Sequence, residues 1–291
     1  MSVTRFAFKL QDGDNVIDLA QCMSIVQRTM VRQKQIFTVL GGQIIDNPAV
    51  QTPVKISTAP NFWYIRAGIN RAFKAWKDQR AKTLANANLE TGVGAKHVGK
   101  FADFKVSLLG ESAGSLVVPH YTGTNTVLPI AGSDEYARAS VTQENGAERH
   151  FRILGGHTGT FYGTTYGWLS TRVIPDAEHE PNMLDLDGNA VLDYKEDFLN
   201  LLNETDDDQA NRLELLYEDN DNAPFPVRDI YGGVSETHNL QLQSFVYVND
   251  NNPSQMIPGF KALCGLVHVN VGTDATNPIL FLDVMNTPEG F

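Results

Sequence analysis

The chain has 291 residues, of which 42% are hydrophobic and 20% charged, the composition of an ordinary soluble globular protein. No apolar run approaches the roughly 18 residues that a membrane-spanning helix needs, so a membrane partner is not expected. The net charge of −11 is sorted along the chain: residues 1–105 hold 15 Lys and Arg against 7 Asp and Glu, whereas residues 106–291 hold 8 against 27.

The first 45 residues predict two strands with a helix between them. Residues 3–10 alternate, with Phe6 and Phe8 on one face and Arg5 and Lys9 on the other, as in a half-buried strand. Residues 15–32 are expected to form a helix, because apolar residues recur at helical spacing after a capping Asp14 and Asn15. A second β-branched run follows at residues 35–45.

A second helix is predicted over residues 60–84, and a third over residues 194–218. Pro60 suits a first helical turn, and the apolar stripe of the second helix consists of Phe62, Ile65, Ile69, Phe73 and Trp76. Short strands are expected at residues 103–109, 115–118, 137–142, 150–154, 168–174, 243–248, 261–271 and 279–285.

This pattern is typical of a mainly β protein. Many short strands bounded by Gly, Pro, Asn or Asp favour a sandwich or barrel over a doubly wound sheet, with the helices as insertions. No internal repeat or linker is evident, so residues 1–291 are expected to form one elaborated β domain. Cys22 and Cys264 are too few for a disulfide framework and lie among apolar neighbours, as buried free thiols do.

The second helix carries the densest basic cluster of the chain. At about 100° per residue, five cations fan round one flank of the helix beside its apolar stripe. They are Arg66, Arg71, Lys74, Lys77 and Lys82. Such a helix can pack through one side and offer cations to phosphates on the other, which gives nucleic-acid binding without sequence preference. The alternative is a solvated or intersubunit face. Trp63 and Tyr64 are interpreted as packing residues, with stacking on bases as the alternative.

Residues 110–114 read Gly-Glu-Ser-Ala-Gly and fit the nucleophile elbow of serine esterases, with Ser112 as the nucleophile. The elbow needs a helix after the serine, but the residues that follow are β-branched and end in Pro119. The motif is therefore interpreted as a Gly-rich turn between two strands, and an enzyme is not expected. A serine esterase of the α/β-hydrolase type that uses Ser112 is the alternative function.

Residues 185–196 align with the calcium loop of an EF-hand. The candidate ligands are Asp185, Asp187, Asn189, Asp193 and Glu196. Ala190 stands where the sharp bend of such a loop wants glycine, and the preceding segment, residues 175–181, is bounded by prolines. A turn before an acidic helix start explains the same residues. No cofactor is therefore expected apart from this candidate Ca²⁺ site, and a calcium-dependent β-sandwich binding module is a further alternative.

Several segments together resemble the capsid proteins of uncultivated environmental viruses with small circular single-stranded DNA genomes. These segments are residues 18–22 running to Arg28 and Gln33, residues 66–77 (RAGINRAFKAWK), residues 219–225 (DNDNAPF) with residues 231–233, and residues 258–266 (PGFKALCGL). They are spread over the whole chain.

The resemblance implies a single jelly-roll β-sandwich that self-assembles with many copies of itself into an icosahedral shell around nucleic acid. It places the protein in the virion, and in the host cell during assembly. Many such proteins begin with an arginine-rich arm, but the N-terminal segment of this chain has only Arg5 and Lys9. Genome contact is therefore expected on folded surfaces such as the second helix. The net charge of −11 fits either an acidic outer face with a mildly basic inner one, or an empty or loosely filled shell.

Overall fold

The computed structural model describes residues 2–91, 103–109, 115–116, 119–120, 140–142, 148–157, 160–170 and 240–291. The chain divides into two compact units, one made of residues 1–169 and 231–291 and the other of residues 170–230. The division does not test the expectation of a single domain, which stays a prediction.

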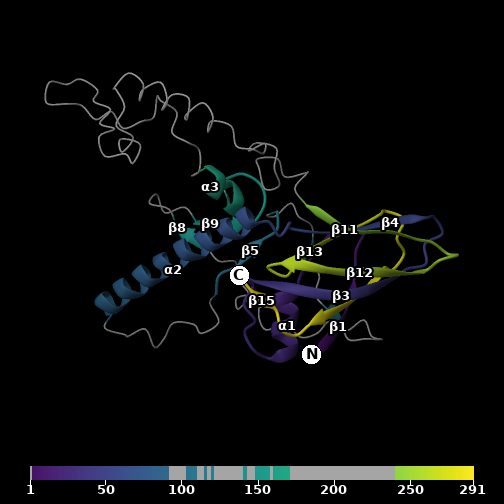
Figure 1. Ribbon diagram of the computed structural model, residues 1–291, viewed down its shortest axis with the longest axis horizontal. Helices are drawn as coiled ribbons and strands as arrows, with labels where there is room; N and C mark the ends of the chain where they lie inside the picture. The colour runs from purple at the N-terminus through teal and green to yellow at the C-terminus, as the bar shows by residue number, and fades with distance from the viewer. Residues whose placement is uncertain are drawn as a thin grey trace, which may run out of the picture. The chain divides into compact units, whose positions relative to one another are not determined.

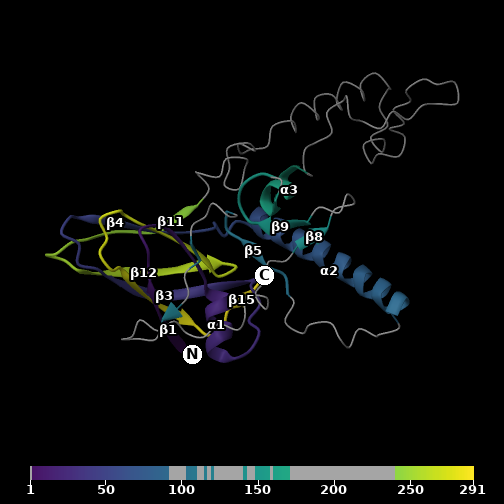
Figure 2. The same cartoon turned by 180° about the vertical axis from the view of Figure 1, so that it is seen from behind.

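The first unit is built mainly from antiparallel strands (Figure 1, and Figure 2 from behind). One sheet has the order β12-β3-β14-β1-β7, with β15 also paired to β3. Its strands are β1 (Val3–Lys9), β3 (Gln35–Ile45), β7 (Pro119–His120), β12 (Ser254–Leu263), β14 (Ile279–Met285) and β15 (Glu289–Gly290).

A second sheet has the order β11-β4-β13-β2-β6. Its strands are β2 (Gly13–Asp18), β4 (Thr52–Thr58), β6 (Ser115–Leu116), β11 (Gln241–Val248) and β13 (Leu266–Val271). The pairing is antiparallel except between β2 and β6, which run parallel.

Eight of these strands pair as a folded-over hairpin. The first strand, β1, pairs with the last long strand, β14; β2 pairs with β13, β3 with β12, and β4 with β11. Residues 59–240 are inserted between β4 and β11, at the closed end of this hairpin. We call β1–β4 and β11–β14 the two-sheet body.

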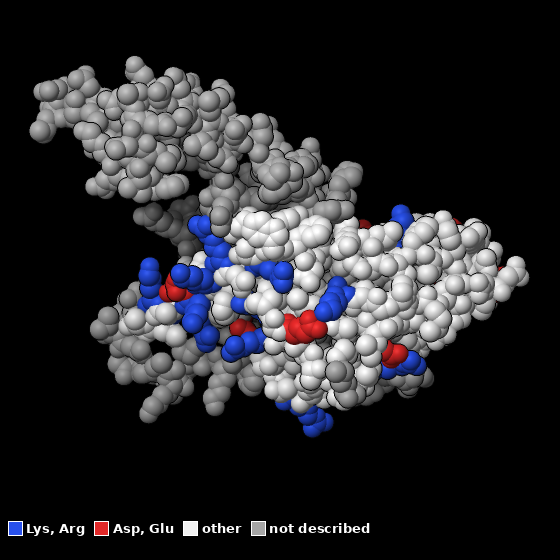
Figure 3. All heavy atoms as spheres, in the orientation of Figure 1, with Lys and Arg blue, Asp and Glu red and all other residues white. Residues whose placement is uncertain are grey.

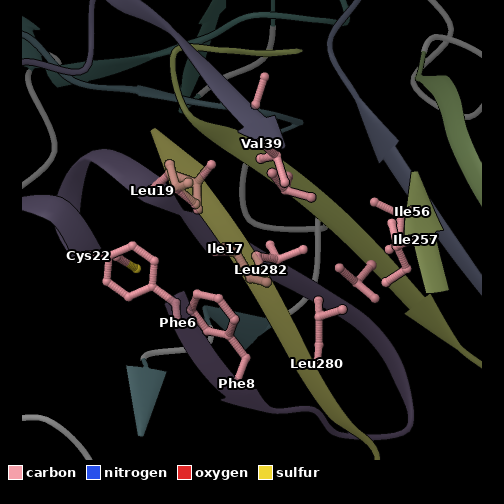
Figure 4. Packing of buried hydrophobic residues seen from close by; sticks show 14 of the residues in the cluster. Phe6, Phe8, Ile17, Leu19, Cys22, Val39, Ile56, Ile257, Leu280 and Leu282 are labelled. Atoms are coloured by element: carbon pink, nitrogen blue, oxygen red, sulfur yellow. The ribbon is translucent and has the colours of Figure 1, made fainter. Parts of the chain in front are cut away.

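One hydrophobic core joins the two sheets, an arrangement consistent with a β-sandwich. Burial alternates along β14, as it does in a strand with one face in a core. Figure 4 shows Phe6, Phe8 and Leu282 of one sheet in the same cluster as Ile17 and Ile56 of the other. The two cysteines are buried and free, as predicted.

The insertion contributes a second core and a small third sheet. Its described elements are α2 (Trp63–Thr91), β5 (Val106–Ser107), β8 (Ser140–Thr142), β9 (Glu148–Arg152), β10 (Phe161–Gly163) and α3 (Thr164–Ser170). The second core joins Ile65 and Ile69 of α2 to Phe104 and Phe151, and it includes Leu263 and its neighbours in the turn after β12.

The predicted helix over residues 15–32 is wrong at both ends, since α1 starts only at Leu19 and ends at Gln27, after which Arg28 adopts a left-handed conformation. Residues 13–18 form β2, because Asn15 and its neighbours pair with β13. The helix α1 (Leu19–Gln27) begins only after Asp18, whose carboxylate accepts hydrogen bonds from the backbone N–H of Ala20 and Gln21. The side chain of Asn15 instead bonds both backbone groups of Gln11 and stabilises the turn before β2.

Three other predicted elements differ in detail. The second helix begins at Trp63 rather than at Pro60 and continues to Thr91. The expected strand over residues 261–271 is two strands, because Cys264 and Gly265 adopt positive φ and form a tight turn. The expected strand over residues 168–174 is wrong at its start, since Trp168 belongs to α3. The predicted third helix, residues 194–218, lies outside the described residues.

Candidate nucleic-acid interface

The basic helix α2 packs on the second core through one side. Ile65, Ile69 and Ala72 are buried, and Phe73 and Trp76 are partly buried against Phe104, with ring centroids 5.6 and 6.1 Å from it. This is the apolar stripe that the sequence predicts, apart from Phe62, which precedes the helix and is 39% exposed. The packing fixes which side of α2 faces solvent.

Gly68 allows α3 to lie directly against α2. A Cβ atom at this position would be 2.6 Å from the carbonyl oxygen of Thr164 and 3.1 Å from the Cα of Thr165. Both are backbone atoms, which a side-chain rotation cannot move away. The position therefore admits glycine and no larger residue without a shift of the first turn of α3.

We expect Gly68→Ala to lower the free energy of unfolding by about 1–3 kcal/mol because of this contact. In an open helix the same change would stabilise the protein by about 1 kcal/mol, so the sign of the effect tests the contact. Urea unfolding followed by circular dichroism measures it. Ala81→Gly, at an exposed position of the same helix, is the control and should cost about 1 kcal/mol. A stabilised Gly68→Ala variant would show that α3 does not pack here.

Four of the five predicted cations on α2 are exposed, and Arg66 is half-buried. The exposed ones are Arg71, Lys74, Lys77 and Lys82. We call these five residues the cationic face of α2. Figure 3 shows Lys and Arg atoms gathered along α2 with few acidic atoms among them. Asp78 is the one acidic residue between Lys55 and Glu90. The structure thus brings together on one helix the residues that the sequence singles out.

Two further cations, Arg80 and Lys34, lie beside aromatic rings of α2 and were not predicted as part of the site. The guanidinium of Arg80 lies 5.4 Å from the Trp76 ring, and Lys34 Nζ lies 4.8 Å from the Phe73 ring. The i, i+4 spacing of Trp76 and Arg80 could have indicated the first contact. No local signal indicates the second, because Lys34 lies just before β3.

Trp63 is 59% exposed although its ring contacts two other rings, so the interpretation as a packing residue accounts for only part of its surface. Tyr64, in contrast, is partly buried against the second core, as expected. The Trp63 ring has two perpendicular aromatic neighbours, Trp168 at 5.1 Å and Tyr64 at 6.1 Å.

Buried hydrogen bonds from the Gln33 side chain connect β5 to the segment that precedes β3. Val106 of β5 also belongs to the second core, on which α2 packs. The side chain of Gln33 bonds both backbone groups of Val106: its Nε2 donates to the oxygen at 3.0 Å, and its Oε1 accepts from the N–H at 2.7 Å. Gln33 Nε2 also donates to Asp18 at 3.3 Å. Burial raises the pKa of Asp18, and the positive charge of Lys105 opposes that shift.

The acidic excess of the chain belongs to the second unit. Residues 170–230 hold 17 Asp and Glu against 4 Lys and Arg, whereas the first unit holds 17 against 19. The net charge of −11 is therefore the sum of −13 on one unit and +2 on the other. The unit that carries α2 is weakly basic, so its surface charge does not oppose contact with a polyanion.

The other candidate sites lie outside the described residues. These are Ser112 with its glycines and the five candidate calcium ligands of residues 185–196. The segment after the serine motif begins with β6, a strand paired to β2. Among the residues that the structure describes, no three His, Cys, Asp or Glu side chains are grouped as metal ligands, and no helix is long and apolar enough to cross a membrane.

Comparisons of the chain with protein-family models, curated proteins and solved structures find no match.

Proposed function

We propose that this protein is a viral capsid protein whose copies assemble into an icosahedral shell around nucleic acid, and that its two-sheet body is a single jelly roll. The single observation that carries the proposal is the pairing of the eight strands. The charge of α2 and the exposed apolar side chains of both sheets are independent support.

The strand order supports the jelly roll. Numbered one to eight along the chain, the body strands give one sheet in the order 6-3-8-1 and a second in the order 5-4-7-2. Consecutive strands alternate between the sheets except at the hairpin of strands four and five, as they do when one long hairpin is rolled up. Jelly rolls of eight strands form the shells of many viruses and also occur in lectin domains and cupins.

Exposed apolar side chains on both outer faces support self-association. On β11, Phe245 and Tyr247 are 44% and 45% exposed, and their rings contact each other at 4.8 Å. On the other sheet, Met256 is 73% exposed, near the cross-strand pair of Ile45 and Ile279. Exposed apolar clusters of this kind are common at protein–protein contacts. Two different patches suit the repeated contacts of a closed shell.

The cationic face of α2 supports contact with nucleic acid. Its lysines and arginines can neutralise phosphates without reading bases, which suits a protein that encloses a genome of any sequence. The unit that carries α2 has a net charge of +2, which is compatible with binding a polyanion although the whole chain is net negative.

Electron microscopy and light scattering of the purified full-length chain test this proposal. We expect uniform hollow or filled particles in negative stain. The double variant Phe245→Glu and Tyr247→Glu should abolish them without lowering the melting temperature, because the added charges would be buried at the contact. Val50→Glu, at a site that is 58% exposed, is the matched control and should still assemble.

Two outcomes would count against parts of this proposal. A wild-type chain that stays a monodisperse monomer at low and high salt would contradict the shell function. Normal particles from the double variant would show that β11 is not a subunit contact and would leave the shell function standing.

A further inference from the structure

We propose that Trp63 is a base-stacking residue that makes the cationic face of α2 prefer single-stranded over double-stranded nucleic acid. This inference rests on the proposed contact between α2 and nucleic acid and names the strand form that the contact selects. The observation that carries it is the combination of exposure and orientation of the Trp63 ring.

Trp63 exposes most of a large apolar ring to solvent. It is 59% exposed, whereas Trp168, its contact in α3, is 8% exposed and belongs to the interior. Among the large hydrophobic residues that the structure describes, only Met256 is more exposed. An exposed indole beside a row of exposed cations is the combination found where proteins stack bases and bind phosphates of a single strand.

The Trp63 ring is held in place before any ligand arrives. Trp168 meets it with an interplanar angle of 89° and Tyr64 with one of 88°. Edge-to-face contacts of this kind are favourable and fix the plane of the indole. A ring that is already oriented loses little conformational freedom when a base stacks on its open surface.

Trp63 lies on the same side of α2 as the exposed lysines. At about 100° per residue, Lys74 is rotated about 20° from Trp63 around the helix axis, and Lys77 about 40°. At 1.5 Å per residue they lie about 17 and 21 Å further along that axis. Ala67 and Asn70, which are small or short, occupy the intervening turns. An extended strand can therefore place one base on Trp63 while its backbone runs along the lysines.

Stacking on Trp63 requires a base with a free face. The bases of a duplex are already stacked on each other, so only a single strand, or an end, offers such a face. The lysines recognise phosphates in either form. The helix thus combines one aromatic platform with a track of cations, the two components of proteins that bind single strands without sequence preference. DNA and RNA share this chemistry.

Fluorescence anisotropy with the full-length chain tests the assignment. The probes are labelled oligo-dT and oligo-rU of about 20 nucleotides, longer than the site of one binding module, and a DNA duplex of the same length. We expect Trp63→Ala to weaken single-strand binding by about tenfold and to leave duplex binding and the salt dependence unchanged. Trp63→Phe should keep the single-strand affinity within about threefold, because a phenyl ring still stacks.

Phe62→Ala is the matched control, because Phe62 is a neighbouring aromatic residue that is 39% exposed and precedes the first turn of α2. It should bind both probes as the wild type does. If Trp63→Ala loses affinity equally for oligo-dT and oligo-rU, Trp63 stacks on the bases of both DNA and RNA. If the affinity falls for only one probe, Trp63 stacks on that nucleic acid alone.

Three results would overturn the assignment: single-strand affinity unchanged in Trp63→Ala, equal losses for single strand and duplex, or a wild-type chain that binds neither. Electron microscopy tests the shell function separately, because particles can form whichever of these three binding results is obtained. Loss of particles in Trp63→Ala with unchanged single-strand binding would identify Trp63 as a subunit contact instead.

Discussion

Replacing Phe8 with alanine is expected to lower the free energy of unfolding by about 3–5 kcal/mol. Phe8 is fully buried on β1, its ring lies 6.1 Å from that of Phe6, and the cluster around it draws on both sheets. Truncation removes the transfer free energy of the ring and leaves a cavity that two antiparallel sheets cannot readily close. A loss of this size is a large part of the stability of an ordinary domain, so assembly should fail as well.

Urea unfolding followed by circular dichroism measures this change. Phe245→Ala is the control, since it removes the same ring from an outer face where 44% of the residue is exposed. It should cost less than about 1 kcal/mol. Similar losses in the two variants would mean that the shared core is not what holds the sheets together.

The sequence predicts most of the body strands but misses β4 (Thr52–Thr58) and assigns most of β2 to a helix. The expected strands over residues 35–45 and 279–285 have the observed bounds, and Phe6 and Phe8 point into the core as their alternation predicts. These strands have one face in the core, so the period-2 pattern is a direct record of burial.

The misassigned N-terminal helix shows where local pattern is insufficient. Val16 and Leu19 fit helical spacing with Met23, yet Val16 belongs to a strand that pairs with residues 266–271. The pairing joins residues about 250 positions apart, and no local signal contains it. Asp18 is the better cap, because its carboxylate reaches two free N–H groups of the first turn.

The positions of the cations on α2 could be predicted from the sequence, but the packing of other elements around Trp63 could not. Helical geometry alone places Arg71, Lys74 and Lys77 away from the apolar stripe. How much of Trp63 is exposed depends on α3. This helix packs against Gly68, and its residue Trp168 contacts the indole of Trp63. Sequence cannot show which neighbour covers a ring, so packing was the natural interpretation for an aromatic residue next to a helix start.

Reversing two charges on α2 is expected to have the largest effect on nucleic-acid binding. In the double variant Lys74→Glu and Lys77→Glu, the affinity for a labelled single-stranded oligonucleotide should fall by about 100-fold at low salt. Both side chains are exposed, so the fold should tolerate the change. The slope of log affinity against log salt should decrease in magnitude by about 1.4, because about 0.7 of a counterion is released per single-strand phosphate contact.

A second pair of substitutions with the same net charge separates local contact from overall charge. Lys9→Glu with Arg28→Asp also changes the net charge by −4, at exposed residues of β1 and of the end of α1. If nucleic acid contacts the cationic face of α2, this control should lose less than about threefold, because charges more than a Debye length from the strand are screened. Equal losses in both variants would mean that the chain attracts nucleic acid through its total charge, and the assignment of the interface to α2 would then be wrong. A loss confined to the α2 pair requires phosphates near Lys74 and Lys77, on the helix side where Trp63 also lies.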